Sequence, residues 1–274
     1  MGREGIGWDE TESGGEVGYI RGMASNEWDA ASYNKNARFV SDLGSAVLEL
    51  LAAQEGESIL DLGCGDGALT ERIPGEVWGL DAAPSMVEAA RQRGLHVVEG
   101  DMHHFALGRK FDAVFTNAVL HWTRDIHAVV GCVQQHLRPG GRFVGEFGGF
   151  GNVAAIATAL RASLRESAVD DEGFAWYYPT AQEFAQVLEQ GGFRVNAAQL
   201  IPRPTPLPTG MRKWMETFAR PWVKHLPREE QERVFDRAVE LLAPALRDTA
   251  SQWTADYVRL RFHATLLTEA GQPA

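Results

Sequence analysis

One short segment near the start of the chain limits the possible folds more than any other. The run Ile59–Gly67 reads Ile-Leu-Asp-Leu-Gly-Cys-Gly-Asp-Gly, an apolar stretch of strand length that leads into glycines at alternate positions. Glycine accepts the positive φ angles of a tight turn and lets the backbone approach a ligand closely. A strand that passes through such a turn into a helix is typical of ligand-binding α/β sheets. We therefore expect an α/β fold with a ligand at this turn.

The residues that follow alternate between strand and helix patterns. We predict strands at 58–61, 77–80, 95–99, 111–116 and 142–147, and helices at 67–73, 84–93 and 124–137, with an earlier helix at 36–53. Strands that alternate with helices pair in parallel through right-handed crossovers. The first half of the chain therefore predicts a doubly wound, Rossmann-like sheet.

The second half of the chain departs from this alternation. It predicts a helix near 180–190, a strand at 193–201, a proline-rich loop at 202–208, helices at 209–219 and 227–245, and a long antiparallel last strand from Trp253 to Leu267. We expect a helical cap at about 205–250, inserted between the two closing strands. Residues 1–25 are rich in glycine and acids and predict a disordered leader, and residues 26–274 predict one domain.

Charge and cysteine usage argue against several classes of protein. The 26 basic residues against 37 acidic ones give a net charge of −11, which repels nucleic-acid phosphates. No stretch is long and apolar enough to cross a membrane, and the start of the chain does not resemble a secretion signal. The two cysteines provide neither a disulfide framework nor a metal site. We expect a cytoplasmic protein, monomeric or homodimeric, without nucleic-acid, membrane or metal partners.

Acidic residues end three successive predicted strands. Asp61 precedes the glycine turn, Asp81 ends the second strand, and Asp101 follows the third. Acids at the turn disfavour pyrophosphate and suit a ligand with ammonium and sulfonium charges, so they favour S-adenosylmethionine (SAM) over NAD. Asp81 is placed to accept both ribose hydroxyls, and Asp101 to accept the adenine amino group beside the backbone amide of Met102. Ala82, Ala83 and Met86 form an apolar bed for adenine. Taken singly, Asp81 also fits a helix cap and Asp101 a solvated turn.

Four segments resemble the motifs of class I SAM-dependent methyltransferases. They are Asp61–Gly67, Gly79–Met86, Asn117–Trp122 and Leu137–Gly141. Within that superfamily the chain is most similar to trans-aconitate methyltransferase, through Trp28 with Tyr33, Asn117–Trp122, and Trp214–Trp222. The resemblance implies a class I methyltransferase fold that binds SAM and releases S-adenosylhomocysteine (SAH). The cofactor-binding residues would be Trp28, Tyr33, Asp61, Gly63, Cys64, Gly65, Asp81, Ala82, Met86, Asp101, Met102 and Asn117.

The resemblance also implies a small-molecule acceptor, with a carboxylate as the methylated group. An ionised carboxylate needs no general base, whereas a phenol, an amine or an activated carbon benefits from one. His121 is the candidate base, and a contact to cofactor or substrate or a purely structural role are the alternatives. The family often has glutamine at this position, which leaves the acceptor open. Candidate substrate contacts are Trp122, Glu146, Trp214, Arg220 and Tyr257.

Other functions compete with this interpretation. The same core serves N-, C- and phenol O-methyltransferases and enzymes that form methyl esters on acyl carriers. A nucleic-acid amine methyltransferase would resemble Asn-Pro-Pro-Tyr after the fourth strand, where this chain has Asn117-Ala118-Val119-Leu120. A protein that binds SAM as a regulator, without methyl transfer, is the non-enzymatic alternative.

Overall fold

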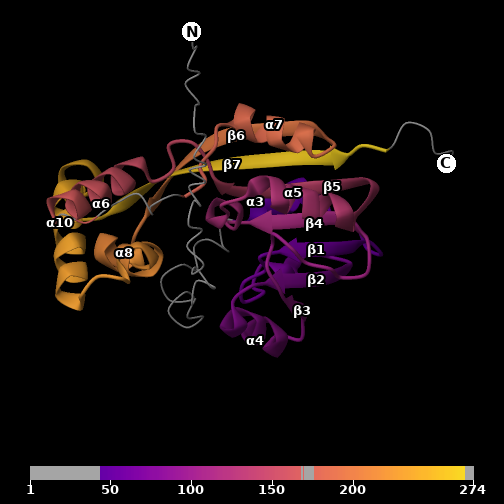
Figure 1. Cartoon of the computed structure of the whole chain (residues 1–274), viewed down its shortest axis with the longest axis horizontal. Helices are drawn as coiled ribbons and strands as arrows, with labels where there is room; N and C mark the ends of the chain where they lie inside the picture. Colours follow the sequence, from indigo (N-terminus) through magenta and orange to yellow (C-terminus); the bar gives the residue numbers. More distant parts are fainter. Residues whose placement is uncertain (1–43, 168, 170–175, 269–274) are drawn as a thin grey trace, which may run out of the picture.

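The computed structural model describes residues 44–167, 169 and 176–268, and these residues contain a seven-stranded sheet (Figure 1). Its strand order is β3-β2-β1-β4-β5-β7-β6. The strands are β1 (Ser58–Leu62), β2 (Glu76–Asp81), β3 (His96–Glu99), β4 (Phe111–Asn117), β5 (Leu137–Gly148), β6 (Phe193–Pro206) and β7 (Thr254–Leu266). Strands β1 to β5 pair in parallel, and β7 pairs antiparallel with both β5 and β6. The predicted fold, mostly parallel with an antiparallel last strand, is confirmed.

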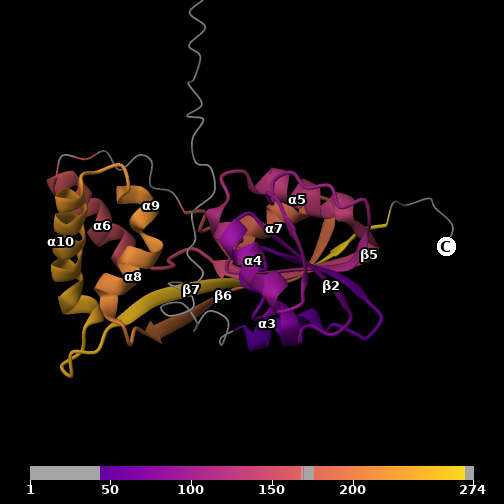
Figure 2. The ribbon, with the colours of Figure 1, turned by 90° about the horizontal axis from the view of Figure 1, so that it is seen from below.

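Helices cover both faces of the sheet. Along β5, Phe143 packs in the same apolar cluster as Val129 of α5 and Phe184 of α7. Its neighbour Val144 packs with Val47 of α3. Successive side chains of a strand point to opposite faces, so α5 and α7 lie on one side of the sheet and α3 on the other (Figure 2). The described helices are α3 (Ser45–Leu51), α4 (Pro84–Gln92), α5 (Ile126–His136), α6 (Ala154–Glu166), α7 (Ala181–Gln190), α8 (Gly210–Phe218), α9 (Arg220–Val223) and α10 (Arg228–Leu246).

Local sequence explains where several of these helices begin. Helix α4 starts with Pro84, whose fixed φ suits the first turn of a helix. The Asp125 side chain accepts a hydrogen bond from the Ala128 amide and caps α5. Helix α7 has a full capping box, in which Thr180 and Glu183 each bind the other's backbone amide. These caps fix the connections between strands and helices around the sheet.

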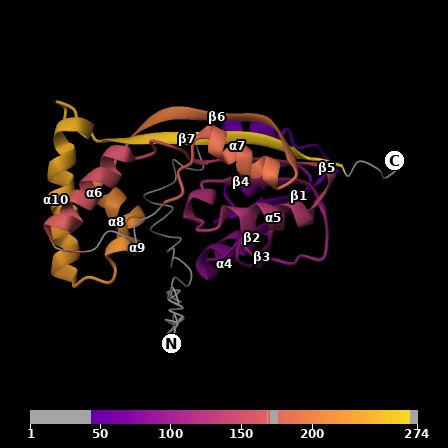
Figure 3. The ribbon, with the colours of Figure 1, turned by 45° about the horizontal axis from the view of Figure 1, so that its top comes forward.

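A separate helical lobe consists of α6, α8, α9 and α10. Its core includes Leu160, Met215, Val234 and Phe235, all buried. The long strands β6 and β7 extend beyond the rest of the sheet and reach this lobe (Figures 2 and 3). Helices α8, α9 and α10 come from the segment between β6 and β7, where the sequence predicts a cap. The lobe thus lies beside the sheet. Strands β6 and β7 reach it, and the chain also enters it from β5 through α6.

Two predicted details are wrong, and one helix is not predicted. The segment 67–73 forms only a short 3-10 turn, Thr70–Arg72, and the Thr70 hydroxyl donates to buried Asp61 there. The predicted loop at 202–208 is strand as far as Pro206. Proline is tolerated there because β6 is an edge strand, and Pro202, Pro204 and Pro206 alternate, so every ring nitrogen is directed to the unpaired edge. Helix α6 has no counterpart in the sequence prediction.

Some predictions concern residues outside the described ranges. The leader at 1–25, the start of the helix predicted at 36–53, and the aromatic pair Trp28 and Tyr33 are among them. Within the described residues, no helix combines the length and the apolar character that a membrane crossing requires.

Candidate active site

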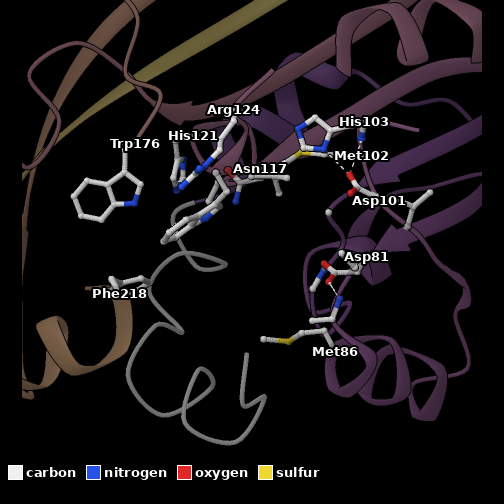
Figure 4. Close-up of a pocket in the computed structure, with 18 of the residues that line it drawn as sticks. Asp81, Met86, Asp101, Met102, His103, Asn117, His121, Arg124, Trp176 and Phe218 are labelled. Carbon is white, nitrogen blue, oxygen red and sulfur yellow. Dashed lines mark hydrogen bonds and ion pairs between the residues drawn. The ribbon is translucent and has the colours of Figure 1, made fainter. Parts of the chain in front are cut away.

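A pocket of about 370 Å³ opens where the carboxyl ends of the parallel strands face the helical lobe. Such a volume lies within the range of small-molecule sites. Figure 4 shows Asp81, Met86 and Asp101 on one side of the pocket and Trp176 and Phe218 on the other, with Asn117 and His121 between them. The pocket therefore has two halves, one formed by the sheet ends and one by the helical lobe and its connections.

The glycine turn forms the floor of the first half. Gly63 has φ +78°, and a Cβ there would lie 2.2 Å from a methyl group of Val119, so only glycine fits. The amides of Gly63 and Cys64 donate to the Leu80 carbonyl at 2.7 and 3.1 Å and so fasten the turn to β2. The Gly65 amide donates to Asp81 at 2.9 Å. The turn and the Asp81 carboxylate are thus held as one unit.

Asp81 is a half-buried carboxylate whose position is fixed by two backbone amides. Gly65 donates to Oδ2 and Ala83 to Oδ1, each at 2.9 Å. Burial raises the pKa of Asp81, and the hydrogen bonds from Ala83 and Gly65 oppose that rise. Each oxygen has an acceptor position left beyond these bonds. The geometry suits a ligand that presents paired hydroxyl donors.

Asp101 is coupled to a histidine that the sequence analysis does not name. His103 donates its backbone amide to Asp101 at 2.9 Å, and its Nδ1 lies 2.5 Å from the same carboxylate oxygen. Its other ring nitrogen lies 2.7 Å from the Thr123 hydroxyl. Burial raises the pKa of Asp101, but the two hydrogen bonds from His103 outweigh it, and the pKa is lowered overall. Asp101 is therefore an ionised acceptor at the pocket edge.

His121 lies between the two halves and is buried. The Gly148 amide donates to its Nδ1 at 3.3 Å, so the neutral ring carries its proton on Nε2. Burial and the nearby positive charge of Arg259 hold the pKa of His121 well below its ordinary value. At neutral pH the ring thus offers a hydrogen-bond donor at Nε2, and the geometry disfavours the base role considered above.

Arg259 is a buried cation that lines the pocket, with 7% of its surface exposed. Its guanidinium lies over the Tyr257 ring, 4.4 Å from the ring centroid. No carboxylate of the described residues pairs with it. The next arginine on the same face of β7, Arg261, is by contrast bonded to Glu146. An arginine buried without an anion is costly unless a ligand supplies one.

The structure brings most of the predicted site residues together around the pocket. They are Gly63, Gly65, Asp81, Ala82, Met86, Asp101, Met102, Asn117, His121, Trp122, Trp214 and Tyr257. Within this group Trp214 donates its indole N–H to the Tyr257 hydroxyl at 2.5 Å. Trp28 and Tyr33 lie outside the described residues.

Four predicted residues do not line the pocket. Asp61 is buried behind the glycine turn, and burial raises its pKa to about 7. Cys64 packs with Val87, Ala90 and Val97, because the strand that leads into the turn directs it into that cluster. Glu146 is 2% exposed and binds Arg203 and Arg261, so it holds β5, β6 and β7 together. Arg220 lies on the exposed side of α9.

Several residues that line the pocket are not among the predicted site residues. They are His103, Arg124, Asn152, Trp176, Tyr178, Phe218 and Arg259. The alternation of Tyr257, Arg259 and Arg261 on β7 places them on one face, but only the packing shows which arginine is already paired. Among the described residues, no group of three or more histidine, cysteine or acidic side chains could hold a metal ion.

The pocket fits SAM on the observations above. The glycine turn leaves the backbone bare, Asp81 and Asp101 offer carboxylate acceptors, and Ala82, Ala83 and Met86 supply an apolar surface between them. When bound, SAM supplies an electrophilic methyl group on a sulfonium centre.

Comparisons with known proteins agree with this site. Residues 60–145 match the family model described as a methyltransferase domain. The chain is 33% identical over 261 residues to an uncharacterized methyltransferase of Schizosaccharomyces pombe, covering 88% of this chain and 99% of that protein.

More local matches involve enzymes with named substrates. A malonyl-[acyl-carrier protein] O-methyltransferase of Serratia marcescens is 35% identical over 41% of this chain and 46% of its own length. A trans-aconitate 2-methyltransferase of an Azoarcus species is 34% identical over 42% and 48%. The chain thus spans less than half the length of these two enzymes.

A solved structure shows the same fold. The structure of loganic acid methyltransferase with SAH has a TM-score of 0.64 and 12% identity, and the match covers 89% of this chain and 98% of that one. Together with the near full-length relative, these matches show that the chain belongs to the SAM-dependent methyltransferase family.

Proposed function

We propose that the enzyme transfers the methyl group of SAM to a carboxylate oxygen of a small-molecule acid. One observation carries the proposal: Arg259 lines the acceptor half of the pocket as a buried cation without an anionic partner among the described residues. A carboxylate is the group that a guanidinium binds best, through two parallel hydrogen bonds.

We assign roles in the cofactor half from the hydrogen-bond acceptors and apolar side chains that line it. Asp81 binds the ribose hydroxyls and Asp101 the adenine amino group, with Met102, Met86 and Ala82 beside the ring. The backbone of Gly63 and Gly65 permits close approach, and Asn117 lies at the boundary with the acceptor half. These roles deepen the SAM assignment and are tested below by substitution.

The proposed reaction needs no general base. A carboxylate is ionised at neutral pH and attacks the methyl carbon itself, so one O–C bond forms, one S–C bond breaks, and no proton is released. Arg259 binds the carboxylate of the acid, and Nε2–H of His121 donates a hydrogen bond to the same carboxylate. The enzyme's contribution is alignment and exclusion of water.

Two of the local relatives carry names that support a carboxylate acceptor, because both trans-aconitate and a malonyl group bear carboxylates. The malonyl enzyme favours a second candidate, in which the acid is attached to an acyl carrier. The small-molecule acceptor, the cytoplasmic location and the monomeric or homodimeric state stay predictions.

The test is an acceptor panel with SAH formation as the readout. Each carboxylic acid is paired with its amide, and phenols, amines and malonyl thioesters of an acyl carrier complete the panel. The proposal expects methyl esters of free acids and no product from the amides. Transfer only to phenols or amines would overturn it, and transfer only to the thioester would select the acyl-carrier candidate.

A further inference from the structure

The lining of the acceptor half indicates what surrounds the reacting carboxylate. We propose that the acceptor is a monocarboxylic acid with an apolar body, and that polycarboxylates are excluded. This inference rests on the proposed carboxylate methylation and adds the class of acid. It follows from an aromatic wall opposite the sheet ends and from the distribution of charge around it.

The aromatic wall consists of Trp122, Trp176, Tyr178, Trp214 and Phe218, all of which line the pocket. Trp176 is its centre, with ring centroids 6.1 Å from Trp122, 5.3 Å from Tyr178 and 6.3 Å from Trp214. Phe218 continues the wall 5.1 Å from Trp214. Such a surface binds flat or aliphatic groups through their contact area.

Three arginines of the described residues that do not line the pocket are neutralised by carboxylates. Arg203 and Arg261 share the buried carboxylate of Glu146. Arg212 of α8 faces α10 and pairs with Glu216, Glu232 and Asp236.

The described lining of the pocket contains two arginines, and they differ in burial. Arg124 lines the pocket but is exposed, whereas Arg259 is buried. Arg259 is thus the buried cation that the described residues offer to an acid. A second carboxylate against the aromatic wall would lose its hydration without a buried cation to replace it.

The wall also resembles the aromatic surfaces that bind ammonium groups. Arg259 argues against an amine, because a cationic acceptor in the same half would be repelled by its charge. Its guanidinium already occupies the face of Tyr257. An acceptor with one carboxylate and an apolar body fits both features, because the carboxylate pairs with Arg259 and the apolar body packs against the aromatic wall.

Matched acids test the inference in the SAH-formation assay. Octanoic acid is compared with octanedioic acid, and 3-phenylpropanoic acid with 4-(2-carboxyethyl)benzoic acid, so that each pair differs by a distal carboxylate. Trans-aconitic acid is included as a polycarboxylate. We expect kcat/KM to be at least about tenfold higher for the monocarboxylate of each pair. Binding is followed independently by quenching of tryptophan fluorescence in the SAH-loaded protein.

A charge placed in the wall provides the second test. Phe218→Lys should reduce the preference for the monocarboxylate and improve turnover of the matched diacid. Phe150→Lys is the control, because Phe150 is 63% exposed and does not line the pocket. Circular dichroism and SAH affinity establish that both variants fold. If the ratio of kcat/KM for the monocarboxylate to that for the diacid is the same in Phe218→Lys and in Phe150→Lys, the aromatic wall does not select the acid.

The outcomes separate the two proposals. If diacids or trans-aconitate are methylated as well as the monocarboxylates, the apolar body is wrong and carboxylate methylation stands. If the enzyme methylates only phenols or amines, carboxylate methylation is wrong as well. If no acid of either kind binds or reacts, both proposals fail.

Discussion

The buried imidazole of His121 and the buried guanidinium of Arg259 both line the pocket, and the positive charge of Arg259 acts on the imidazole. Burial first, and then the positive charge of Arg259, lower the pKa of His121 well below its ordinary value. The imidazole therefore stays neutral beside this arginine, which has no carboxylate partner in the described part of the chain, and the Gly148 amide fixes the imidazole proton on Nε2. Both side chains therefore present donors to an acceptor, which is the arrangement that an anion requires.

The pH dependence of turnover tests this assignment of His121. Because burial and Arg259 hold its pKa well below the ordinary value, the ring is neutral at neutral pH, and we expect kcat/KM for an acid acceptor to show no step near the ordinary pKa of histidine, about 6.5. His121→Gln, which keeps an N–H donor, should retain most of the activity, whereas His121→Leu should lose about tenfold. A rate that rises with a midpoint near the ordinary pKa of histidine, and that disappears in His121→Gln, would instead identify a base.

Asp81 should determine cofactor affinity. Asp81→Ala removes the carboxylate that faces the pocket, and loss of two hydrogen bonds to a charged acceptor should weaken SAH binding by about 100-fold or more. Calorimetry measures the affinity, and Asp125→Ala is the control because Asp125 also accepts a backbone amide but caps α5 away from the pocket. Equal SAH affinity in the two variants would remove Asp81 from the cofactor site.

The buried carboxyl group of Asp61 should make the stability of the fold depend on pH. Burial raises its pKa to about 7 from the ordinary value of 3.8, so the folded protein binds the proton more tightly than the unfolded chain. Stability relative to Asp61→Asn should therefore fall as pH rises from about 4 to 7, by up to about 4 kcal/mol. Urea unfolding of both proteins without SAM measures this difference. A difference that is constant across this pH range would show that Asp61 is ionised throughout.

The sequence predicts the part of the site that local backbone geometry determines. The glycine turn and the strand ends with Asp81 and Asp101 follow from order along the chain, because parallel strands bring their carboxyl ends to one edge. The acceptor half could not be predicted in this way. Arg261 and Arg259 lie on the same face of β7 but differ in role, because Glu146 binds Arg261 together with Arg203, whereas no carboxylate of the described residues pairs with Arg259.

For the fold too, the sequence predicts what order along the chain determines but not what tertiary contacts determine. Alternating strands and helices predict the doubly wound sheet, and the antiparallel last strand is confirmed. The prolines at 202–206 suggest a loop, because the sequence does not reveal that β6 is an edge strand with its ring nitrogens on the unpaired side. The environment of a residue, rather than its type, decides these positions.

The most direct test of the account is the binding of an acid to the SAH-loaded enzyme by calorimetry, in the wild type and in Arg259→Gln. The acid is the one that the wild type methylates fastest, and its amide is the control. We expect the substitution to weaken acid binding by about 100-fold while SAH still binds, and the amide to bind neither protein measurably. Equal affinity of the two proteins for the acid would contradict the anion site on which the proposed function depends.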